Sequence, residues 1–395
     1  MTRAVALLAF VAALSPAGSS AQLAKGPRTP QTASGCLTAL GASKAIAANR
    51  TAFAHRCADS IVAHGVRRAD VPTLAVLYDS AQDPARAHAY LLLRELDVPI
   101  MSADLGMRYS ADTPTLAALA AMDSLAIRLD ALPASVNDLK ALAHQKLLVD
   151  SKALKDHDRI MHHARRVIDC GSEIRPRARI LNDVIGRAAD DLAQAFGDNG
   201  QADSAIAMLD RVRRVLGDAR FATSGLATVR SRYALVGRPA PPIEAQHWLN
   251  TDLRGPIAPD RGKVTLIQFT GVTCAPCRAS YPAMTALYNR FDHSHFDMLF
   301  VTTLTGEFDS KKVSPADEIS ATRDYYAKRY DFPFRIAVSD AAPATYATAS
   351  RYYMAGIPQI VIVDKTGVIR WIGLGWDSTS TAPLQKRIAD LIAEP

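Results

Sequence analysis

Two cysteines, Cys274 and Cys277, are separated by two residues and follow a short apolar run. The run, Val264–Phe269, is rich in β-branched residues and is typical of a buried strand. After the cysteines, apolar residues recur at helical spacing, so the pair is expected in the first turn of a helix. The unpaired N–H groups and the positive dipole end of a helix stabilise a thiolate, the reactive form of cysteine. The position therefore favours thiol chemistry.

The spacing predicts a role for each thiol. In Cys-X-X-Cys motifs the pKa of the first thiol falls from about 8.5 to between about 3.5 and 7.5. Cys274 is therefore expected to attack a disulfide, and Cys277 is expected to close the intramolecular disulfide and release the partner. A zinc site would need two more Cys or His ligands at matching spacing, and none lies nearby in the sequence. A purely structural disulfide is the other alternative, but so short a loop gains little from chain entropy.

Several ordered motifs resemble the thioredoxin superfamily, specifically its extracytoplasmic TlpA/ResA-type thiol-disulfide oxidoreductases. The motifs are Gly237-Arg238-Pro239-Ala240-Pro241, Gly262-Lys263, Cys274-Ala275-Pro276-Cys277 with Pro282 beyond it, and the segment from Gly356 to Gly367. The resemblance implies a thioredoxin-fold α/β domain over residues 236–395, no bound cofactor, and cysteine-containing proteins as substrates. Pro276 and Pro282 are implied to tune this region, and the missing N–H of Pro282 is expected to kink the helix.

The resemblance also implies a second part of the site. In this family a cis-proline faces the cysteine pair, and here that place is taken by Pro358. The preceding Ile357 is implied to offer its backbone N–H and C=O groups to an extended substrate segment. A trans loop proline is the alternative. With Phe269 and Trp376, the apolar Ile357 would make the docking surface hydrophobic.

Three positions are compared here with the family pattern. Thr273 stands where relatives carry Trp before the first cysteine, and we assign it to the substrate-binding surface. Gln268 stands where many relatives carry a buried acid or amide, and Ser280 stands where TlpA/ResA-type relatives carry Glu. Because neither Gln268 nor Ser280 is a carboxylate, we expect Cys277 to lose its proton less readily than in relatives and mixed disulfides to live longer.

The other elements after residue 236 are predicted from hydrophobic pattern and turn residues. We expect strands over Met298–Thr303, Phe334–Val338, Ile360–Val363 and Val368–Ile372, and helices over Asp317–Tyr330, Ala342–Tyr353 and Thr381–Ile392. Strands separated by helices, followed by a hairpin and a last helix, imply a central mixed sheet covered on both faces.

The first 21 residues are expected to be a secretory signal peptide. One Arg3 precedes an apolar run too short to span a bilayer, and small residues precede Gln22. An ordinary buried N-terminal helix is the alternative. Residues 22–35 are polar and contain proline and glycine, which predicts a flexible leader.

Export would place the chain in an oxidising compartment, most simply a bacterial periplasm, where nucleic acid is not an expected partner. A reductant in that compartment would depend on a membrane electron donor, since no soluble thiol pool maintains it.

Residues 36–235 are rich in Ala and Leu with repeated helical periodicity, which predicts an all-α domain of about eight to eleven short helices. Breaks are expected near Gly65, Asp83-Pro84, Pro99, Pro114, Pro133, Gly171, Gly197–Gly200 and Gly217. From Leu192 to Val212 the small and apolar residues have the spacing of a tetratricopeptide (TPR) unit, so TPR-like repeats and an unrelated helical bundle both stay open. A repeat array would offer a concave face to a protein partner. The whole chain is thus predicted to be α+β.

The net charge of +7 comes mostly from this helical part, because residues 236–395 hold 17 Lys and Arg against 16 Asp and Glu. Five arginines gather within it: Arg165, Arg166, Arg175, Arg177 and Arg179. A solvated face and a docking site for an acidic partner or membrane surface are the two interpretations.

The remaining cysteines and histidines are placed by spacing and compartment. Cys36 and Cys57 are expected to form a structural disulfide between two helices. Cys170 is expected to pack as a small buried hydrophobe, with a free thiol that partners the cysteine pair as the alternative. His157, His162 and His163 cluster in sequence, but His157 and His162 fall on different faces of a helix. No metal site is therefore expected.

Two other functions compete with thiol-disulfide exchange. Peroxidases of the redoxin type carry Pro and Thr or Ser ahead of the reactive cysteine, and here those places hold Ile267 and Gly271. A binding module would instead use the helical array to recruit a partner and the thioredoxin-like domain to dock a peptide. Replacing both Cys274 and Cys277 by Ser separates a binding module, which keeps its function, from an oxidoreductase.

Overall fold

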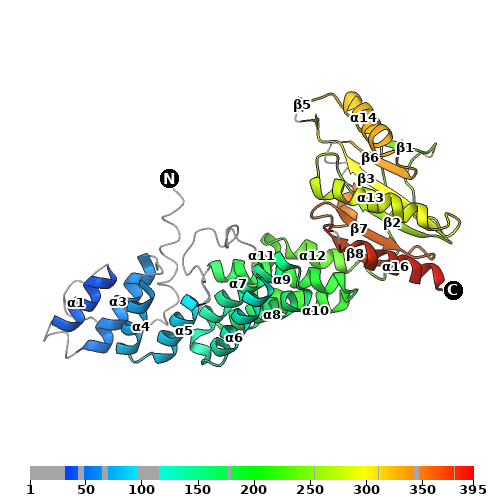
Figure 1. The fold of residues 1–395 in the computed structure, drawn as a ribbon. Coiled ribbons are helices and arrows are strands. Elements are labelled where there is room, and N and C mark those ends of the chain that lie inside the picture. Colours follow the sequence, from blue (N-terminus) through cyan, green and yellow to red (C-terminus); the bar gives the residue numbers. More distant parts are fainter. Residues whose placement is uncertain are drawn as a thin grey trace. The chain divides into compact units, whose positions relative to one another are not determined.

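The computed structural model describes residues 32–42, 49–64, 70–95, 115–175, 179–252, 254–309, 311–340, 347–377 and 379–395. The expected signal peptide and most of the expected leader lie outside these ranges. The chain divides into two compact units, residues 1–195 with 212–220 and residues 196–211 with 221–395. Helices come first and an α/β region with a six-stranded mixed sheet follows (Figure 1). The predicted fold class is confirmed, and the proposed domain boundary near residue 236 stays a prediction.

Eleven α-helices precede residue 236 within the described ranges. They are α1 (Ala33–Ala42), α3 (Arg50–His64), α4 (Val71–Ser80), α5 (Pro84–Glu95), α6 (Leu116–Asp130), α7 (Asn137–Leu154), α8 (His157–Glu173), α9 (Arg179–Asp198), α10 (Ala202–Leu216), α11 (Asp218–Thr223) and α12 (Leu226–Tyr233). A 3-10 turn, Ala134–Val136, precedes α7. Because α1 begins at Ala33, the flexible leader predicted to reach residue 35 ends earlier than expected.

Proline and glycine set several of these helix ends. Pro84 is the first residue of α5, and Gly217 follows α10 with a φ of 80°, a conformation that glycine adopts without steric cost. The break expected near Gly171 follows it closely, because α8 ends at Glu173 and α9 begins at Arg179, although Gly171 itself still lies inside α8. A Cβ there would lie 2.8 Å from Cδ1 of Ile185 on α9, so glycine lets these two helices approach closely. The breaks expected at Gly65, Pro99 and Pro114 lie outside the described residues.

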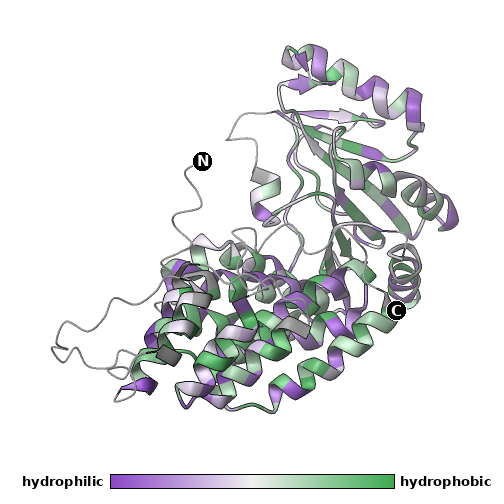
Figure 2. Cartoon of the chain, turned by 60° about the vertical axis from the view of Figure 1, so that its left-hand side comes forward, coloured by the Kyte–Doolittle hydropathy of each residue, from purple (hydrophilic) through white to green (hydrophobic). Residues whose placement is uncertain are grey.

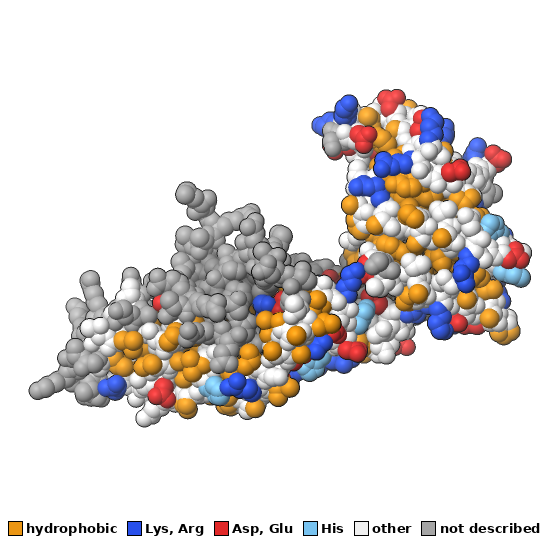
Figure 3. Space-filling view, in the orientation of Figure 1, with side chains coloured by type: hydrophobic (Ala, Val, Ile, Leu, Met, Phe, Trp, Pro, Cys, Tyr) orange, Lys and Arg blue, Asp and Glu red, His pale blue; other side chains and the backbone are white. Residues whose placement is uncertain are grey.

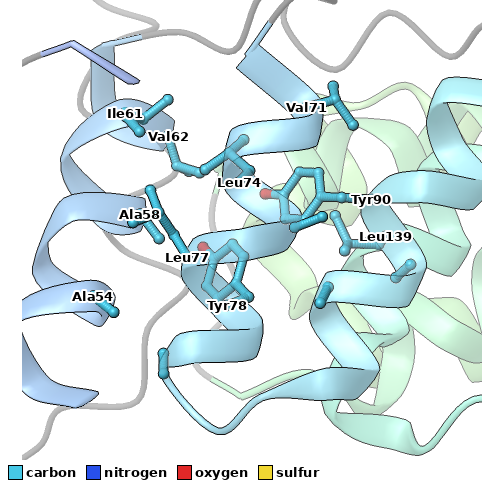
Figure 4. Packing of buried hydrophobic residues seen from close by; sticks show 14 of the residues in the cluster. Ala54, Ala58, Ile61, Val62, Val71, Leu74, Leu77, Tyr78, Tyr90 and Leu139 are labelled. Carbon is cyan, nitrogen blue, oxygen red and sulfur yellow. The ribbon is translucent and has the colours of Figure 1, made fainter. Parts of the chain in front are cut away.

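The first helices share one hydrophobic core, seen from close by in Figure 4. Leu74 and Leu77 of α4 are fully buried in it, together with Tyr90 of α5. The rings of Tyr78 and Tyr90 stack with centroids 5.5 Å apart. Burial of such apolar surface is the main term that stabilises helices of this length.

Two further contacts hold this core together. Cys36 of α1 and Cys57 of α3 form a disulfide, with Cα atoms 5.8 Å apart. Arg86 of α5 forms an ion pair with Asp138 of α7 at 3.1 Å. The disulfide joins residues 21 positions apart, so it removes chain entropy mainly from the unfolded state.

Charges of both signs are interspersed on the face shown in Figure 3. Arg166, one of the clustered arginines, donates to both carboxylate oxygens of Asp130. Arg175 donates to the backbone carbonyls of Ser172 and Ile174. Arg177 lies outside the described residues. These contacts favour the interpretation of the arginines as a solvated face.

The TPR-like stretch covers the end of α9, a turn at Gly200 and most of α10. Gly200 has a φ of 75°, as the turn requires. The apolar residues of this stretch are buried, namely Leu192, Ala193, Phe196, Ala205, Leu209 and Val212. A consecutive pair of helices fits both a repeat and a bundle, so the TPR-like array stays a prediction.

The sheet contains six strands in the order β1-β6-β3-β2-β7-β8. They are β1 (His247–Leu249), β2 (Val264–Phe269), β3 (Phe296–Thr303), β6 (Arg335–Ser339), β7 (Gln359–Val363) and β8 (Ile369–Leu374). β2, β3 and β6 are parallel, whereas β1, β7 and β8 pair antiparallel with their neighbours. The expected mixed sheet is therefore confirmed.

Both faces of the sheet are buried. Val264 and Leu266 of β2 face a layer with Tyr281 and Met284 of α13 (Ala275–Arg290), which α16 (Thr381–Ala393) also joins. The alternate residues of the strands face a second layer, which includes Tyr352. Burial on both faces explains why the strands are apolar along most of their length (Figure 2).

The structure adds elements that the pattern did not predict. β1 was missed, as was a small hairpin formed by β4 (Glu307–Phe308) and β5 (Lys311–Lys312). The helix predicted over Asp317–Tyr330 is α14 (Pro315–Asp324), followed by a π-helical turn, Tyr325–Tyr330. Of the helix predicted over Ala342–Tyr353, only α15 (Ala347–Arg351) lies within the described residues as a helix.

The segment expected to be a linker is ordered by backbone hydrogen bonds. Gly237 N–H donates to the carbonyl of Ile369, and Ala240 N–H donates to that of Gly367. It therefore extends the sheet beside the turn between β7 and β8. Within the described residues, no helix has the length and apolar character needed to cross a membrane.

Leu77→Ala is expected to lower the free energy of unfolding by about 2–5 kcal/mol, because it removes a fully buried side chain and leaves a cavity. Denaturant unfolding followed by far-UV circular dichroism measures this loss. Tryptophan fluorescence would not report on these helices, because all three tryptophans lie after residue 236.

Val76→Ala is the matched control on the same helix. The Val76 side chain is 50% exposed, so its truncation is expected to change the free energy by no more than about 0.5 kcal/mol. Equal losses for the two variants would contradict the burial of Leu77.

Candidate active site

The pairing of β2 with β7 brings two distant segments together. Phe269, the last residue of β2, lies opposite Gln359, the first residue of β7. The strands are antiparallel, so the chain that leaves β2 and the chain that enters β7 meet at the same sheet edge. The first leads to Cys274 and the second contains Ile357 and Pro358. Residues 83 positions apart therefore become neighbours.

Cys274 and Cys277 lie at the start of α13 and form a disulfide, with Cα atoms 5.2 Å apart. Cys274 is the N-cap residue, and its Sγ accepts a hydrogen bond from the Cys277 N–H at 3.1 Å. Pro276 lies in the first turn, where a missing N–H costs no helical hydrogen bond. Because the N–H groups and dipole of α13 point at Cys274, they stabilise negative charge on this sulfur once the disulfide is reduced.

The two cysteines differ in exposure. Cys274 is half-buried, whereas Cys277 is 0% exposed and packs in the layer between α13 and the sheet. An approaching sulfur can therefore reach Cys274 and not Cys277. This asymmetry matches the roles predicted from the sequence.

Ile357 faces the accessible cysteine. The bond between Ile357 and Pro358 is cis, and the carbonyl oxygen of Ile357 lies 3.6 Å from Sγ of Cys274. The Ile357 N–H makes no hydrogen bond to the described part of the chain. The Ile357 side chain is 37% exposed, while Pro358 is buried. The segment thus presents backbone groups and an apolar side chain beside Cys274.

Gly271 permits this close approach. A Cβ at Gly271 would lie 3.1 Å from Cδ1 of Ile357, which is tighter than an ordinary contact. A side chain at this position would require the Ile357 side chain to shift by a few tenths of an ångström. The glycine thus allows the two loops to pack closely.

Tyr281 fixes the loop before the cysteines. Its hydroxyl forms a 2.8 Å hydrogen bond with Oγ1 of Thr270, whose own N–H donates to the carbonyl of Val301. Burial raises the pKa of Tyr281, so this phenol stays neutral. These residues were missed in the sequence analysis, although Tyr281 lies one helical turn after Cys277, on the same face of α13.

Gln268 and Ser280 lie together beneath the site. Nε2 of Gln268 donates to Oγ of Ser280 at 2.9 Å, and that hydroxyl donates to the carbonyl of Cys277 at 2.7 Å. Both side chains are fully buried. Oε1 of Gln268 has no hydrogen-bond partner among the described residues. The pair is polar but uncharged, so it offers Cys277 no carboxylate to receive its proton.

A hollow of about 170 Å³ lies next to Ile357. Thr273, an exposed residue, and Met354 line it, with Phe269 also contributing. Because Phe269 is 1% exposed, it forms part of the wall and core rather than a free docking surface. Trp376 is half-buried and packs against the other layer of the sheet.

The wall of the hollow is held by Glu318. Its carboxylate accepts hydrogen bonds from the N–H groups of Thr305 and Gly306, at 2.7 and 2.8 Å.

Among the described residues, no group of His, Cys, Asp and Glu side chains that could hold a metal ion includes Cys274 or Cys277. Pro282 lies inside α13, which continues to Arg290, and the kink expected at Pro282 stays a prediction.

Residues 236–372 match the family model described as the AhpC/TSA family. The match runs from before β1 into β8 and includes the cysteine pair and the cis-proline segment. This part of the chain is a thioredoxin-like domain that carries a Cys-X-X-Cys disulfide.

Solved structures similar to the chain include three proteins of this kind. A thiol-disulfide isomerase from Corynebacterium glutamicum is 20% identical, and the match covers 40% of this chain and 98% of that one, with a TM-score of 0.31. The thioredoxin domain of a thiol-disulfide oxidoreductase from Bacteroides vulgatus is 21% identical over 40% of this chain and 97% of that one, with a TM-score of 0.30. A thiol:disulfide interchange protein from a Bacteroides species is 18% identical over 40% and 91%, with a TM-score of 0.29. No curated protein sequence matches the chain.

The other cysteines belong to the helical part of the chain. Cys36 and Cys57 pair with each other in the helical core. Cys170 is free and buried in α8, and burial raises the pKa of its thiol to about 11. Cys170 thus stays neutral at physiological pH, which suits a packing role.

After reduction, Cys274 is expected to react with iodoacetamide faster than Cys277 by roughly tenfold or more, because only Cys274 is accessible and its thiolate lies at the start of a helix. Quenched alkylation of the native protein at pH 7.5, followed by peptide mass spectrometry, measures both rates.

Cys170 serves as the internal control. Because its thiol stays neutral well above pH 9, it is expected to react only after the protein unfolds. Equal rates for Cys274 and Cys277 would contradict the asymmetry of the site.

Proposed function

We propose that the protein exchanges disulfides with cysteine-containing proteins outside the cytoplasm, through Cys274 and Cys277. The observation that carries the proposal is the accessible sulfur of Cys274, held beside a buried Cys277 and 3.6 Å from the Ile357 carbonyl. A structural disulfide would need neither the difference in exposure nor the open backbone groups of Ile357.

In the reducing direction, the Cys274 thiolate attacks one sulfur of a substrate disulfide. A bond forms between Cys274 and that sulfur, and the second substrate sulfur leaves as a thiolate. Cys277 then loses its proton and attacks Sγ of Cys274. The Cys274–Cys277 bond forms, the first substrate sulfur leaves as a thiolate, and two electrons have passed to the substrate.

In the oxidising direction the same steps run in reverse. The disulfide form accepts attack by a substrate thiolate at Cys274, and Cys277 leaves as a thiolate. A second substrate thiolate then attacks the substrate sulfur bonded to Cys274, so that a substrate disulfide forms and the pair is left reduced. The exposure of the two sulfurs makes Cys274 the atom that bonds to the substrate in either direction.

Ile357 is the proposed docking point for the substrate backbone. Its C=O lies against Cys274 and its N–H is not used by the described residues, so an extended segment can pair with it as an added strand. The exposed Ile357 side chain and the neighbouring hollow favour an apolar residue close to the substrate cysteine.

The proposed location is a periplasm, reached through the signal peptide expected at residues 1–21. The Cys36–Cys57 disulfide supports an oxidising compartment, because such bonds rarely persist in a reducing cytosol. A reductant in that compartment would depend on a membrane electron donor. The helical domain is proposed to contact a protein partner.

A redoxin-type peroxidase is less well supported. Ile267 is buried within β2 and Gly271 has no side chain, so neither supplies the Pro or hydroxyl that such peroxidases carry ahead of the reactive cysteine. Consumption of hydrogen peroxide by the reduced protein, lost on Cys274→Ser, would favour this alternative.

Cys277→Ser is expected to accumulate mixed disulfides on Cys274, because the second displacement can no longer occur. The full-length variant is expressed with its signal sequence, and trapped partners are identified by non-reducing electrophoresis and mass spectrometry. Partners should be recovered from the periplasmic fraction.

Two variants control this experiment. Cys170→Ser should behave as the wild type, and Cys274→Ser combined with Cys277→Ser should trap nothing. Absence of mixed disulfides under both oxidising and reducing conditions would instead favour a binding module, whose function the double variant would keep.

Release of a trapped partner is expected to accelerate with pH, by about tenfold per pH unit over the range in which Cys277 is mostly protonated. The reason is that the neutral Gln268–Ser280 pair provides no base for the Cys277 proton. Stopped-flow release of a labelled peptide disulfide between pH 6 and 9 measures the profile.

Ser280→Glu, which installs a carboxylate, should raise the rate at neutral pH and flatten the profile. Ser280→Ala is the matched control and should leave the slope unchanged. A release rate independent of pH in the wild type would contradict the role assigned to this pair.

A further inference from the structure

Three histidines converge on one side of the helical region. His144 comes from α7, and His162 and His163 come from α8. One ring nitrogen from each lies within 4.8 Å of those of the other two. No metal site was expected from His157, His162 and His163, because His157 and His162 fall on different faces of one helix. The structure leaves His157 out and supplies His144 from the neighbouring helix.

The tautomers of two rings are set by carboxylates. Nε2 of His144 lies 3.1 Å from Oδ1 of Asp130, and Nε2 of His163 lies 3.1 Å from Oδ1 of Asp123. A carboxylate accepts hydrogen bonds and donates none, so both Nε2 atoms carry the proton. A neutral imidazole has only one N–H. Both Nδ1 atoms therefore hold lone pairs.

These two lone pairs face each other. Nδ1 of His144 and Nδ1 of His163 are 3.0 Å apart, and both rings are buried. Two buried acceptors at this distance repel unless a positive centre lies next to both. Two nitrogens on one tetrahedral zinc ion, each about 2.0–2.1 Å from the metal, would be about 3.3 Å apart, close to the separation observed.

His162 supplies the third nitrogen. Its ring is exposed, it makes no hydrogen bond with the described residues, and its centroid lies 5.0 Å from that of His163. Because the side chain faces solvent, it can turn toward the other two rings without disturbing the core.

Arginines hold the two carboxylates from outside. Arg166 donates to Asp130, and Arg159 donates to Asp123 at 2.7 Å. The result is two parallel chains, arginine to aspartate to histidine. Outer carboxylates that orient histidines in this way are characteristic of metal sites and raise the basicity of the ligand nitrogen.

We propose that His144, His162 and His163 bind a divalent transition-metal ion, with zinc the best match. Three imidazole nitrogens without a thiolate suit zinc, copper and nickel, and exclude magnesium or calcium as preferred ions. The three histidines border a hollow of about 500 Å³ that Asp123, Asp156 and Asp158 also line. The hollow would leave room for water or a ligand beside a metal ion bound there.

The test is a zinc titration of the untagged full-length chain, stripped with a chelator and kept without reductant so that the disulfide at Cys274 cannot compete for the ion. Competition with a chromophoric chelator at pH 7.5 is expected to reveal one equivalent of tightly bound zinc. Cobalt as a substitute should give the visible absorption of a tetrahedral nitrogen site.

His162→Ala should weaken zinc binding by at least about tenfold, because it removes one ligand from an exposed position. His157→Ala, an exposed histidine on the same helix, is the matched control and should bind as the wild type. Asp123→Asn tests the outer shell and should weaken binding by about 10- to 100-fold. Circular dichroism of each metal-free variant checks that the helices are intact.

Equal affinities of the wild type and His162→Ala would overturn the proposal. So would a wild type that binds no zinc, in which case a proton shared between His144 and His163 would account for their short contact. A zinc-dependent rise in melting temperature in the wild type and the His157→Ala variant, absent in His162→Ala, would support it.

Discussion

The antiparallel register of β2 against β7 is the constraint on which the thiol site depends. Phe269 lies opposite Gln359, so the loop that ends in Cys274 and the loop that contains Ile357 leave the sheet side by side. A slip of one residue would turn each side chain of the strand to the opposite face. Gln268 would leave Ser280, Phe269 would leave Tyr352, and Ile357 would move away from the cysteine.

Strand β2 also contributes different side chains to the two layers that cover the sheet below the site. Gln268 points to the layer of α13, while Phe269 packs against Tyr352 in the other layer, with ring centroids 5.2 Å apart. An uncharged amide and hydroxyl cost less to bury than an ion. The core beneath Cys277 is therefore stable, but it contains no base that could speed the deprotonation of the Cys277 thiol.

Much of the thioredoxin-like domain could be predicted from the sequence because its strands are long, apolar and separated by clear turns. β2 has the predicted bounds, and β7 and α16 differ from prediction by a single residue at one end. β1 has only three residues, too few to show a pattern. The cysteines were found by their spacing, but the Thr270–Tyr281 clamp depends on a contact between a loop and a helix.

The sequence predicted that this region is helical, but it did not predict which helices contact each other. Glycine is typical of helix breaks, but the glycine at position 171 is explained by its close packing against Ile185. His144 lies 18 residues before His162, and periodicity within one helix carries no information about which other helix lies beside it. The histidines form a group only because α7 and α8 pack against each other in the fold.

The bond between Cys36 and Cys57 has a practical consequence for α1. This helix has ten residues, shorter than the length at which an isolated helix is stable in water, and among its described side chains Cys36 and Leu40 are the buried ones. Protein made in a reducing bacterial cytosol would lack the covalent link, so α1 would depend on its noncovalent contacts. Recombinant material from that source would thus start to fray at this end.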